Sequence, residues 1–330
     1  MGIDKTKSYF ARVGDVTILH SASPPRVRLL VLLLLLGPAL SGCNRAGGPS
    51  ASVHAGGESR FSVVAAENTW GSIALHLAGD RARVSSIVSN PNSDPHTYEP
   101  NARDARAIAG AQLVIVNGLG YDKWAGRLLR ASPVPGRRVL DVSRAVGAGG
   151  ESNPHLWYSP AAVHEIVDRI AAAYERLDPA DRAYFERRRR DFQTRALARY
   201  DQLIGAIRAQ YAGAPVGYSE SIFEPLGTSL GLRLMTPAGF AKAVAEGTDV
   251  TAQDKRTVDA QATGRQIEVW VYNRQNVTPD VQRANETARA QRIPVVTVTE
   301  TLSPAGTSFQ AWQVAQLERL RAALRRASGP

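Results

Sequence analysis

The sequence predicts an α/β protein built as two lobes that one long α-helix joins. Apolar strand-like runs alternate with helical segments between residues 59 and 178, and the same alternation returns between residues 213 and 330. A long helical pattern without interruption separates the two regions. Strands that alternate with helices of about ten residues indicate βαβ units and a parallel sheet. We therefore expect a roughly four-stranded parallel sheet, flanked by helices, in each lobe.

The first lobe, residues 59–178, contains four short apolar runs that are typical of buried strands. These runs cover residues 61–66, 83–89, 113–116 and 138–142. Helical segments are expected between them and after them, at residues 69–78, 101–111, 121–131 and from 159 onward. The order along the chain is the one that a parallel α/β lobe requires.

Residues 179–212 form the predicted connector. The segment 181–211 is helical in pattern throughout and carries apolar residues at helical spacing, among them Phe185, Phe192 and Ile207. A helix of about 30 residues is about 45 Å long at 1.5 Å per residue, which is longer than one small lobe needs. Gly213 and Pro215 end the pattern.

The second lobe, residues 213–330, repeats the alternation without repeating the sequence. Strands are expected at residues 216–219, 233–235, 267–272 and 294–298. Helices are expected at residues 222–230, on either side of Gly247 within 237–264, at 279–291 and at 309–327.

The N-terminus predicts export and lipid anchoring. Arg26 and Arg28 precede a short apolar run, which ends in small residues and is too short to span a bilayer. Leu40-Ser41-Gly42-Cys43 resembles the bacterial lipobox, in which the cysteine is lipidated, and Cys43 is the only cysteine in the chain. We interpret residues 1–42 as a lipoprotein signal peptide, residues 43–58 as the lipidated cysteine and a flexible tether, and expect translation to start nearer Arg26 than Met1.

The charge balance does not predict a nucleic-acid-binding protein. Lys and Arg number 40 against 30 Asp and Glu, which gives a net charge of +10. The basic residues are scattered over expected helix faces, without interleaved aromatic residues. The one cluster, Arg187 to Arg190, lies within the long helical pattern and is interpreted as a solvated helix face.

Four polar side chains follow expected strands, where open α/β sheets bind their ligands. His96 and His155 come from the first lobe, and Glu220 and Glu300 from the second. Two imidazoles and two carboxylates meeting across a cleft would suit Mn²⁺, Zn²⁺ or Fe²⁺ and would be a poor calcium site. Glu246, Asp249 and Asp254 are further candidates for the fourth ligand.

The histidine motifs carry a family resemblance. Asp94-Pro95-His96-Thr97-Tyr98-Glu99-Pro100 resembles the DPHxYEP signature of the zinc/manganese ABC-transporter solute-binding proteins, and Asn153-Pro154-His155-Leu156-Trp157 resembles their NPHxW motif. Glu220 and Glu300 match the positions of the third and fourth ligands. The resemblance covers about residues 60 to 327. It implies two α/β lobes bridged by one helix, capture of a divalent metal outside the membrane, and delivery to an ABC permease.

Two departures from the family pattern bear on the choice of metal. Glu300 stands where the family usually has Asp, and its side chain is one methylene longer. The His-rich loop of dedicated zinc importers is absent between His96 and His155, and Glu220 occupies a position that zinc-type members often fill with a third histidine. The resemblance therefore favours Mn²⁺ slightly over Zn²⁺, and Fe²⁺ stays open. We expect Trp157 and Tyr98 to pack around the imidazoles.

The leading hypothesis is a membrane-anchored, monomeric metal receptor without catalytic activity. An extracytoplasmic metallohydrolase is the alternative, because two histidines and a carboxylate can also hold a catalytic zinc ion. Neither HExxH nor a nucleophile elbow is present in support of it. A metal-binding adhesin is the third hypothesis.

Overall fold

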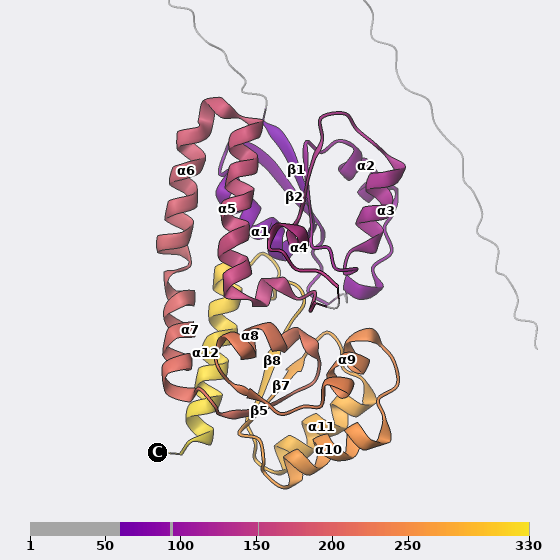
Figure 1. Ribbon diagram of the computed structural model, residues 1–330, viewed down its shortest axis with the longest axis vertical. Helices are drawn as coiled ribbons and strands as arrows, with labels where there is room; N and C mark the ends of the chain where they lie inside the picture. The colour runs from indigo at the N-terminus through magenta and orange to yellow at the C-terminus, as the bar shows by residue number, and fades with distance from the viewer. Residues whose placement is uncertain (1–59, 93–94, 151, 330) are drawn as a thin grey trace, which may run out of the picture. The chain divides into compact units, whose positions relative to one another are not determined.

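Two four-stranded parallel sheets form the framework of the computed structural model, which describes residues 60–92, 95–150 and 152–329 (Figure 1). The first sheet has the order β2-β1-β3-β4 and the second β6-β5-β7-β8, so both follow the same winding. The predicted fold class is confirmed. The strands are β1 (Phe61–Glu67), β2 (Ala82–Val88), β3 (Leu113–Val116), β4 (Arg138–Asp141), β5 (Pro215–Tyr218), β6 (Arg233–Leu234), β7 (Val269–Asn273) and β8 (Val295–Val298).

The helices of the first lobe cover both faces of its sheet, which explains why β3 is buried along its whole length. Asn101 and Asp104 form a capping box that starts α2, and the Ser159 side chain caps α5 ahead of Pro160. Of two 3₁₀ turns in this lobe, η1 (Pro95–Thr97) follows β2 and η2 (Leu156–Tyr158) follows α4. The helices are α1 (Asn68–Ala78), α2 (Ala102–Ala109), α3 (Lys123–Ala131), α4 (Val142–Ala145) and α5 (Pro160–Leu177).

The connector differs from the uninterrupted α-helix that the sequence predicts. It consists of η3 (Pro179–Asp181), α6 (Arg182–Asp191), the π-helical turn η4 (Phe192–Ala196) and α7 (Ala198–Tyr211). The backbone N–H of Leu197 donates to the carbonyl of Phe192, five residues earlier, at 2.9 Å. Both side chains are fully buried, and the wider turn allows two apolar residues at this spacing to enter the same core.

The second lobe has its own set of helices around β5–β8. Gly247, with φ at +67°, ends α9 in the left-handed conformation that glycine adopts without strain. A further short 3₁₀ turn, η5, follows β5, the first strand of this lobe along the chain. The elements are η5 (Ser221–Phe223), α8 (Glu224–Ser229), α9 (Ala238–Glu246), α10 (Ala252–Thr263), α11 (Pro279–Ala290) and α12 (Phe309–Ala327).

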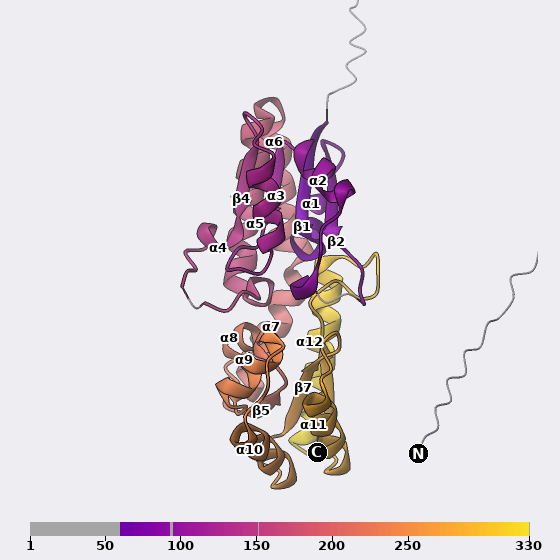
Figure 2. The same cartoon turned by 90° about the vertical axis from the view of Figure 1, so that its right-hand side faces the viewer.

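One apolar cluster continues from the first lobe into the second. It contains residues of α1, α5 and α6 as well as of α7, α12 and the inner face of the second sheet. The C-terminal helix α12 lies against α7 and also contacts α1 (Figures 1 and 2). Two helical paths therefore join the lobes, and the described residues belong to one compact unit. The exact boundaries of the predicted lobes stay a prediction.

The predicted signal peptide, Cys43 and the tether lie outside the described residues. Among the residues that are described, no helix has the length and apolar character needed to cross a bilayer.

Candidate metal centre

His96 lies in the turn η1, after the end of β2, as the sequence predicts. Its side chain is 26% exposed, and its ring packs edge-on against the Tyr121 ring, with the two centroids 4.7 Å apart. Pro95 is buried and restricts the backbone next to it. The predicted neighbour Tyr98 faces elsewhere: it packs on Trp124 and its hydroxyl donates to Asp104 at 2.7 Å. Tyr98 therefore braces the loop rather than the imidazole.

His155 precedes η2 and is fully buried. Its Nδ1 lies 2.8 Å from the side-chain oxygen of Asn153, which also accepts from the backbone N–H of His155 at 3.0 Å. An amide oxygen only accepts, so Nδ1 carries the proton and Nε2 keeps its lone pair. Nε2 is buried without a hydrogen-bond partner, as expected for a nitrogen placed to hold a metal ion. Trp157 packs against the ring at 5.4 Å between centroids, which confirms its predicted place beside the imidazole.

Glu300 follows β8 and brings a buried carboxylate to the two histidines. Its Oε1 lies 3.4 Å from Nε2 of His155 and 3.8 Å from Nε2 of His96. Its Oε2 accepts a hydrogen bond from the Tyr121 hydroxyl at 2.9 Å. Burial by itself would raise the pKa of Glu300, but the charges that the imidazoles of His155 and His96 carry when protonated outweigh it and hold the pKa below its usual value.

These three residues form one possible metal-binding group. The ligand atoms of His96, His155 and Glu300 all lie within 4.8 Å of one another. They come from both lobes, two imidazole nitrogens from the first and one carboxylate oxygen from the second. This nitrogen and oxygen set is of the kind that binds Zn²⁺, Mn²⁺ and Fe²⁺.

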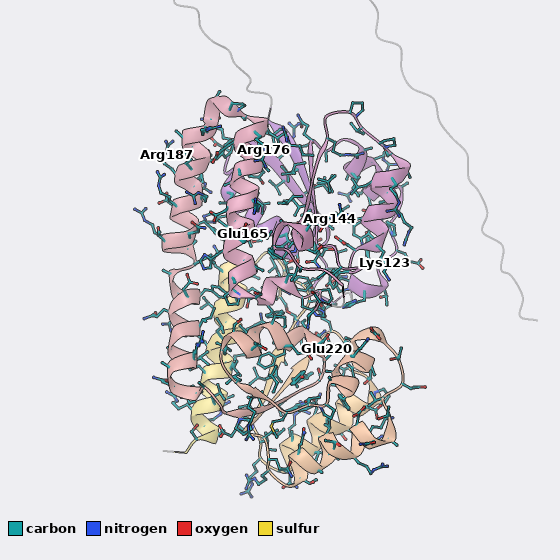
Figure 3. All side chains as sticks on the ribbon, viewed as in Figure 1. Lys123, Arg144, Glu165, Arg176, Arg187 and Glu220 are labelled. Atoms are coloured by element: carbon teal, nitrogen blue, oxygen red, sulfur yellow. The ribbon has the colours of Figure 1, made fainter. Side chains whose placement is uncertain are left out.

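Glu220 lies beside this group but is not part of it among the described residues. It is buried at the end of β5, at the edge of the second lobe that faces the first (Figure 3). Its Oε1 accepts from the side-chain amide of Asn273 at 2.7 Å, and its Oε2 from that of Asn276 at 2.8 Å. Burial and the charge of Glu300 raise the pKa of Glu220 well above its usual value.

The other candidate carboxylates take part in local contacts of the second lobe. Asp254 is the third residue of α10, and its carboxylate accepts a hydrogen bond from the hydroxyl of the N-cap residue Thr251 at 2.9 Å. Glu246 lies 3.9 Å from Lys242 on α9, and Asp249 is exposed. None of the three belongs to the metal-binding group found among the described residues.

Three residues that organise the centre were not singled out from the sequence. The Asn273 amide donates to Glu220 and, at 3.1 Å, to Glu300, and so links the two carboxylates. Gln275 accepts from the backbone N–H groups of Glu300 and Thr301 and donates to the carbonyl of Pro91 at 3.1 Å. Tyr121 joins the lobes through Glu300. Asn273 ends β7, so the strand-end rule that selected Glu220 would also have selected it.

The comparison with family models matches residues 63–323 to the family described as "Zinc-uptake complex component A periplasmic". Curated relatives include a metal ABC transporter substrate-binding lipoprotein of Streptococcus cristatus, 28% identical over 49% of this chain and 55% of the relative. The iron-binding protein YfeA of Yersinia pestis is 30% identical over 39% of this chain and 43% of the relative. The chain spans about half the length of the curated relatives it matches.

Solved structures share the fold. The Mn-bound periplasmic metal binding protein of candidatus Liberibacter asiaticus aligns with a TM-score of 0.68 at 18% identity, covering 81% of this chain and all of the other. The periplasmic zinc binding protein TroA of Treponema pallidum aligns with a TM-score of 0.66 at 18% identity and the same coverage. Both structures therefore have the fold of this chain.

Proposed function

The chain belongs to the zinc-uptake complex component A family, and from this premise we propose that it captures a divalent transition metal outside the cytoplasmic membrane and delivers it to the permease of an ABC importer. The observation that carries the proposal is the buried Nε2 of His155, which has no hydrogen-bond partner and lies 3.4 Å from the Glu300 carboxylate. A buried polar nitrogen without a partner destabilises the folded state, because it has lost its hydrogen bonds to water, and a bound metal ion would restore a partner.

In this proposal His96, His155 and Glu300 are direct metal ligands. Tyr121 donates to Oε2 of Glu300 and the Asn273 amide donates to Oε1 at 3.1 Å, and Oε1 is the oxygen that faces His155, so Glu300 binds the metal through Oε1. Glu220 supplies a further carboxylate beside them and is linked to Glu300 through Asn273. The metal is Mn²⁺, Zn²⁺ or Fe²⁺, with Mn²⁺ slightly favoured, although Zn²⁺ has the higher intrinsic affinity for nitrogen and oxygen ligands.

The proposal includes a lipid anchor on Cys43 and a permease on the same membrane. The lipobox motif supports the first, and the names of the streptococcal relatives, which are metal ABC transporter lipoproteins, support both. Three gathered ligand atoms leave coordination positions open, which alone would also suit a hydrolytic zinc site. Family membership favours binding and delivery over hydrolysis.

Uptake of radioactive Mn²⁺ or Zn²⁺ tests the proposal in cells that lack the natural copy of this chain. The wild-type chain is expected to restore uptake, whereas His155→Asn is expected to reduce it to the background level. His164→Asn is the matched control, because His164 lies on α5 and pairs with Asp201 at 3.0 Å, away from the metal-binding group. Uptake by His155→Asn at the wild-type rate would contradict the proposal.

A further inference from the structure

A large cleft opens onto the metal-binding group. It has a volume of about 970 Å³ and is lined by His96 and His155, by α3 of the first lobe and by α9 of the second. Six waters around a metal ion, at about 30 Å³ each, occupy roughly 180 Å³. The cleft therefore has room for far more than a hydrated ion, and its volume falls in the range of small-molecule sites, roughly 300–1,000 Å³.

The size of the cleft does not come from lobes that have moved apart. Tyr121 bonds to Glu300 across the lobes, and the Tyr158 hydroxyl bonds to the carbonyl of Thr299 at 2.9 Å. Asn153 donates to the carbonyl of Ser221 at 2.6 Å. These hydrogen bonds hold the ligand-bearing segments of both lobes in contact while the cleft remains beside them.

The walls of the cleft carry positive charges that suit an anion. Lys123 and Arg127 project from consecutive turns of α3, and Lys242 lies across from them on α9. Figure 3 places Lys123 at the end of α3 that is nearer the second lobe. Within the part of the chain that the structure describes, neither Lys123 nor Arg127 forms an ion pair. Against these three basic residues the lining holds two acidic ones, Glu224 and Glu246, so its Lys, Arg and Glu residues carry a net charge of +1, which favours an anion over a bare divalent cation.

The two acidic side chains of the cleft lining contact neighbouring residues. Glu224 accepts from Asn153 at 3.1 Å and from Tyr218 at 3.2 Å, and Glu246 lies 3.9 Å from Lys242. The apolar part of the wall is formed by Leu119, Trp124 and Ala238. An organic anion thus meets both cationic and apolar surface next to the open positions of the metal.

We propose that this site takes its metal together with a small polycarboxylate chelator, which completes the coordination of an ion held by His96, His155 and Glu300 while Lys123, Arg127 and Lys242 bind its remaining carboxylates. The inference rests on the proposed function and specifies the form in which the metal arrives. Carboxylate oxygens suit the same metals as the protein ligands do, and guanidinium binds carboxylate through two parallel hydrogen bonds.

Equilibrium dialysis with Zn²⁺ and radiolabelled citrate as the probe tests the inference. The wild-type chain is expected to retain one citrate per chain when Zn²⁺ is present and none when it is absent. If citrate instead strips Zn²⁺ from the protein and is not retained, the inference is wrong, while binding of Zn²⁺ alone keeps the proposed function intact. If Zn²⁺ alone fails to bind, the proposed function itself fails.

The variant Lys123→Gln/Arg127→Gln/Lys242→Gln is expected to affect binding of citrate with Zn²⁺ and binding of Zn²⁺ alone differently. Citrate retention with Zn²⁺ is expected to weaken at least tenfold, because three attractive charges are lost. Affinity for Zn²⁺ alone is expected to stay the same or rise, since the same charges repel the bare ion. Arg130→Gln is the control, as Arg130 is an exposed residue of α3 outside the cleft lining. Equal loss of both affinities in the triple variant would overturn the inference.

Discussion

The hydroxyl of Tyr121, in the first lobe, donates a hydrogen bond of 2.9 Å to Oε2 of Glu300, in the second lobe. The Tyr121 ring also packs against the rings of His96 and His155, with centroids 4.7 and 5.9 Å away. One side chain therefore contacts all three members of the metal-binding group. It leaves Oε1 of Glu300 facing the histidines and fixes the distance between ligands that belong to different lobes.

The variant Tyr121→Phe keeps the ring and removes the hydroxyl that donates this hydrogen bond. Residues that orient metal ligands typically contribute about 10- to 100-fold in metal affinity, so a loss in that range is expected for Zn²⁺ and Mn²⁺ by calorimetric titration. Tyr184→Phe is the control, because it deletes another tyrosine–carboxylate hydrogen bond, to Asp80 at 3.0 Å, away from the centre. Equal affinities of the two variants would rule out a role for the hydroxyl.

The two carboxylates of the centre are expected to differ in importance. Oε1 of Glu300 lies 3.4 Å and 3.8 Å from Nε2 of His155 and of His96, whereas Glu220 is outside the metal-binding group found among the described residues. We expect Glu300→Gln to weaken metal binding at least about 100-fold, beyond the range of orienting residues, and Glu220→Gln to weaken it less. The same titration measures both, and a larger loss for Glu220→Gln would reverse the assignment.

Glu67 predicts a pH dependence of stability in the metal-free protein. It is buried at the end of β1, and burial together with the charge of Asp122 raises its pKa well above the usual value. The folded state therefore binds this proton more tightly than the unfolded chain does. The contribution of Glu67 to stability is fully present below the unfolded pKa of 4.5 and falls as pH rises from there toward the folded pKa, by up to about 1.4 kcal/mol per pH unit.

Glu67→Gln removes this contribution, since its amide stays neutral. Urea unfolding between pH 4.5 and 7 is expected to show a variant that gains stability over the wild type as pH rises. A difference between the two proteins that stays constant over this range would show that Glu67 does not titrate differently on folding.

Gly217 in β5 predicts a packing effect close to Glu220. A Cβ at this position would lie 2.7 Å from Cε3 of Trp270, whose indole is held by a hydrogen bond to Asn285 at 2.7 Å. Gly217→Ala is expected to lower the free energy of unfolding by about 1–3 kcal/mol. Gly205→Ala, in the exposed face of α7 where a Cβ meets nothing within 4 Å, is expected to raise it by about 0.5–1 kcal/mol. Thermal unfolding of both variants checks the opposite signs.

The sequence predicts the sheets and the strand-end residues of the site, but not the π-helical turn or the hydrogen-bond partners of Glu220. Alternation of apolar runs and helical segments identified both sheets, because strand and helix periods are local properties of the sequence. The π-helical turn at Phe192 depends on how Phe192 and Leu197 enter a core formed by distant elements, and no local signal marks it. Likewise, the strand-end positions indicated His96, His155 and Glu300, but not that Asn273 and Asn276 would occupy the oxygens of Glu220.

The contacts that set the centre's geometry are long-range. Tyr121 and Glu300 are 179 residues apart in the chain, and Gln275 reaches Pro91 over 184 residues. The sequence around Tyr121 predicts only the start of a helix after a glycine-rich turn. Which ring meets which carboxylate follows from the packing of the two lobes, so it is visible only in the folded structure.

The central claim is that His96, His155 and Glu300 hold one metal ion together. Calorimetric titration of metal-free wild type, His96→Ala and the control His164→Asn with Zn²⁺ and Mn²⁺ tests it most directly. His96 is suited to this test because its side chain is 26% exposed, so its loss leaves the core intact. We predict one ion per chain for wild type and control, and binding at least about 100-fold weaker for His96→Ala. Wild-type affinity and stoichiometry in His96→Ala would contradict the claim.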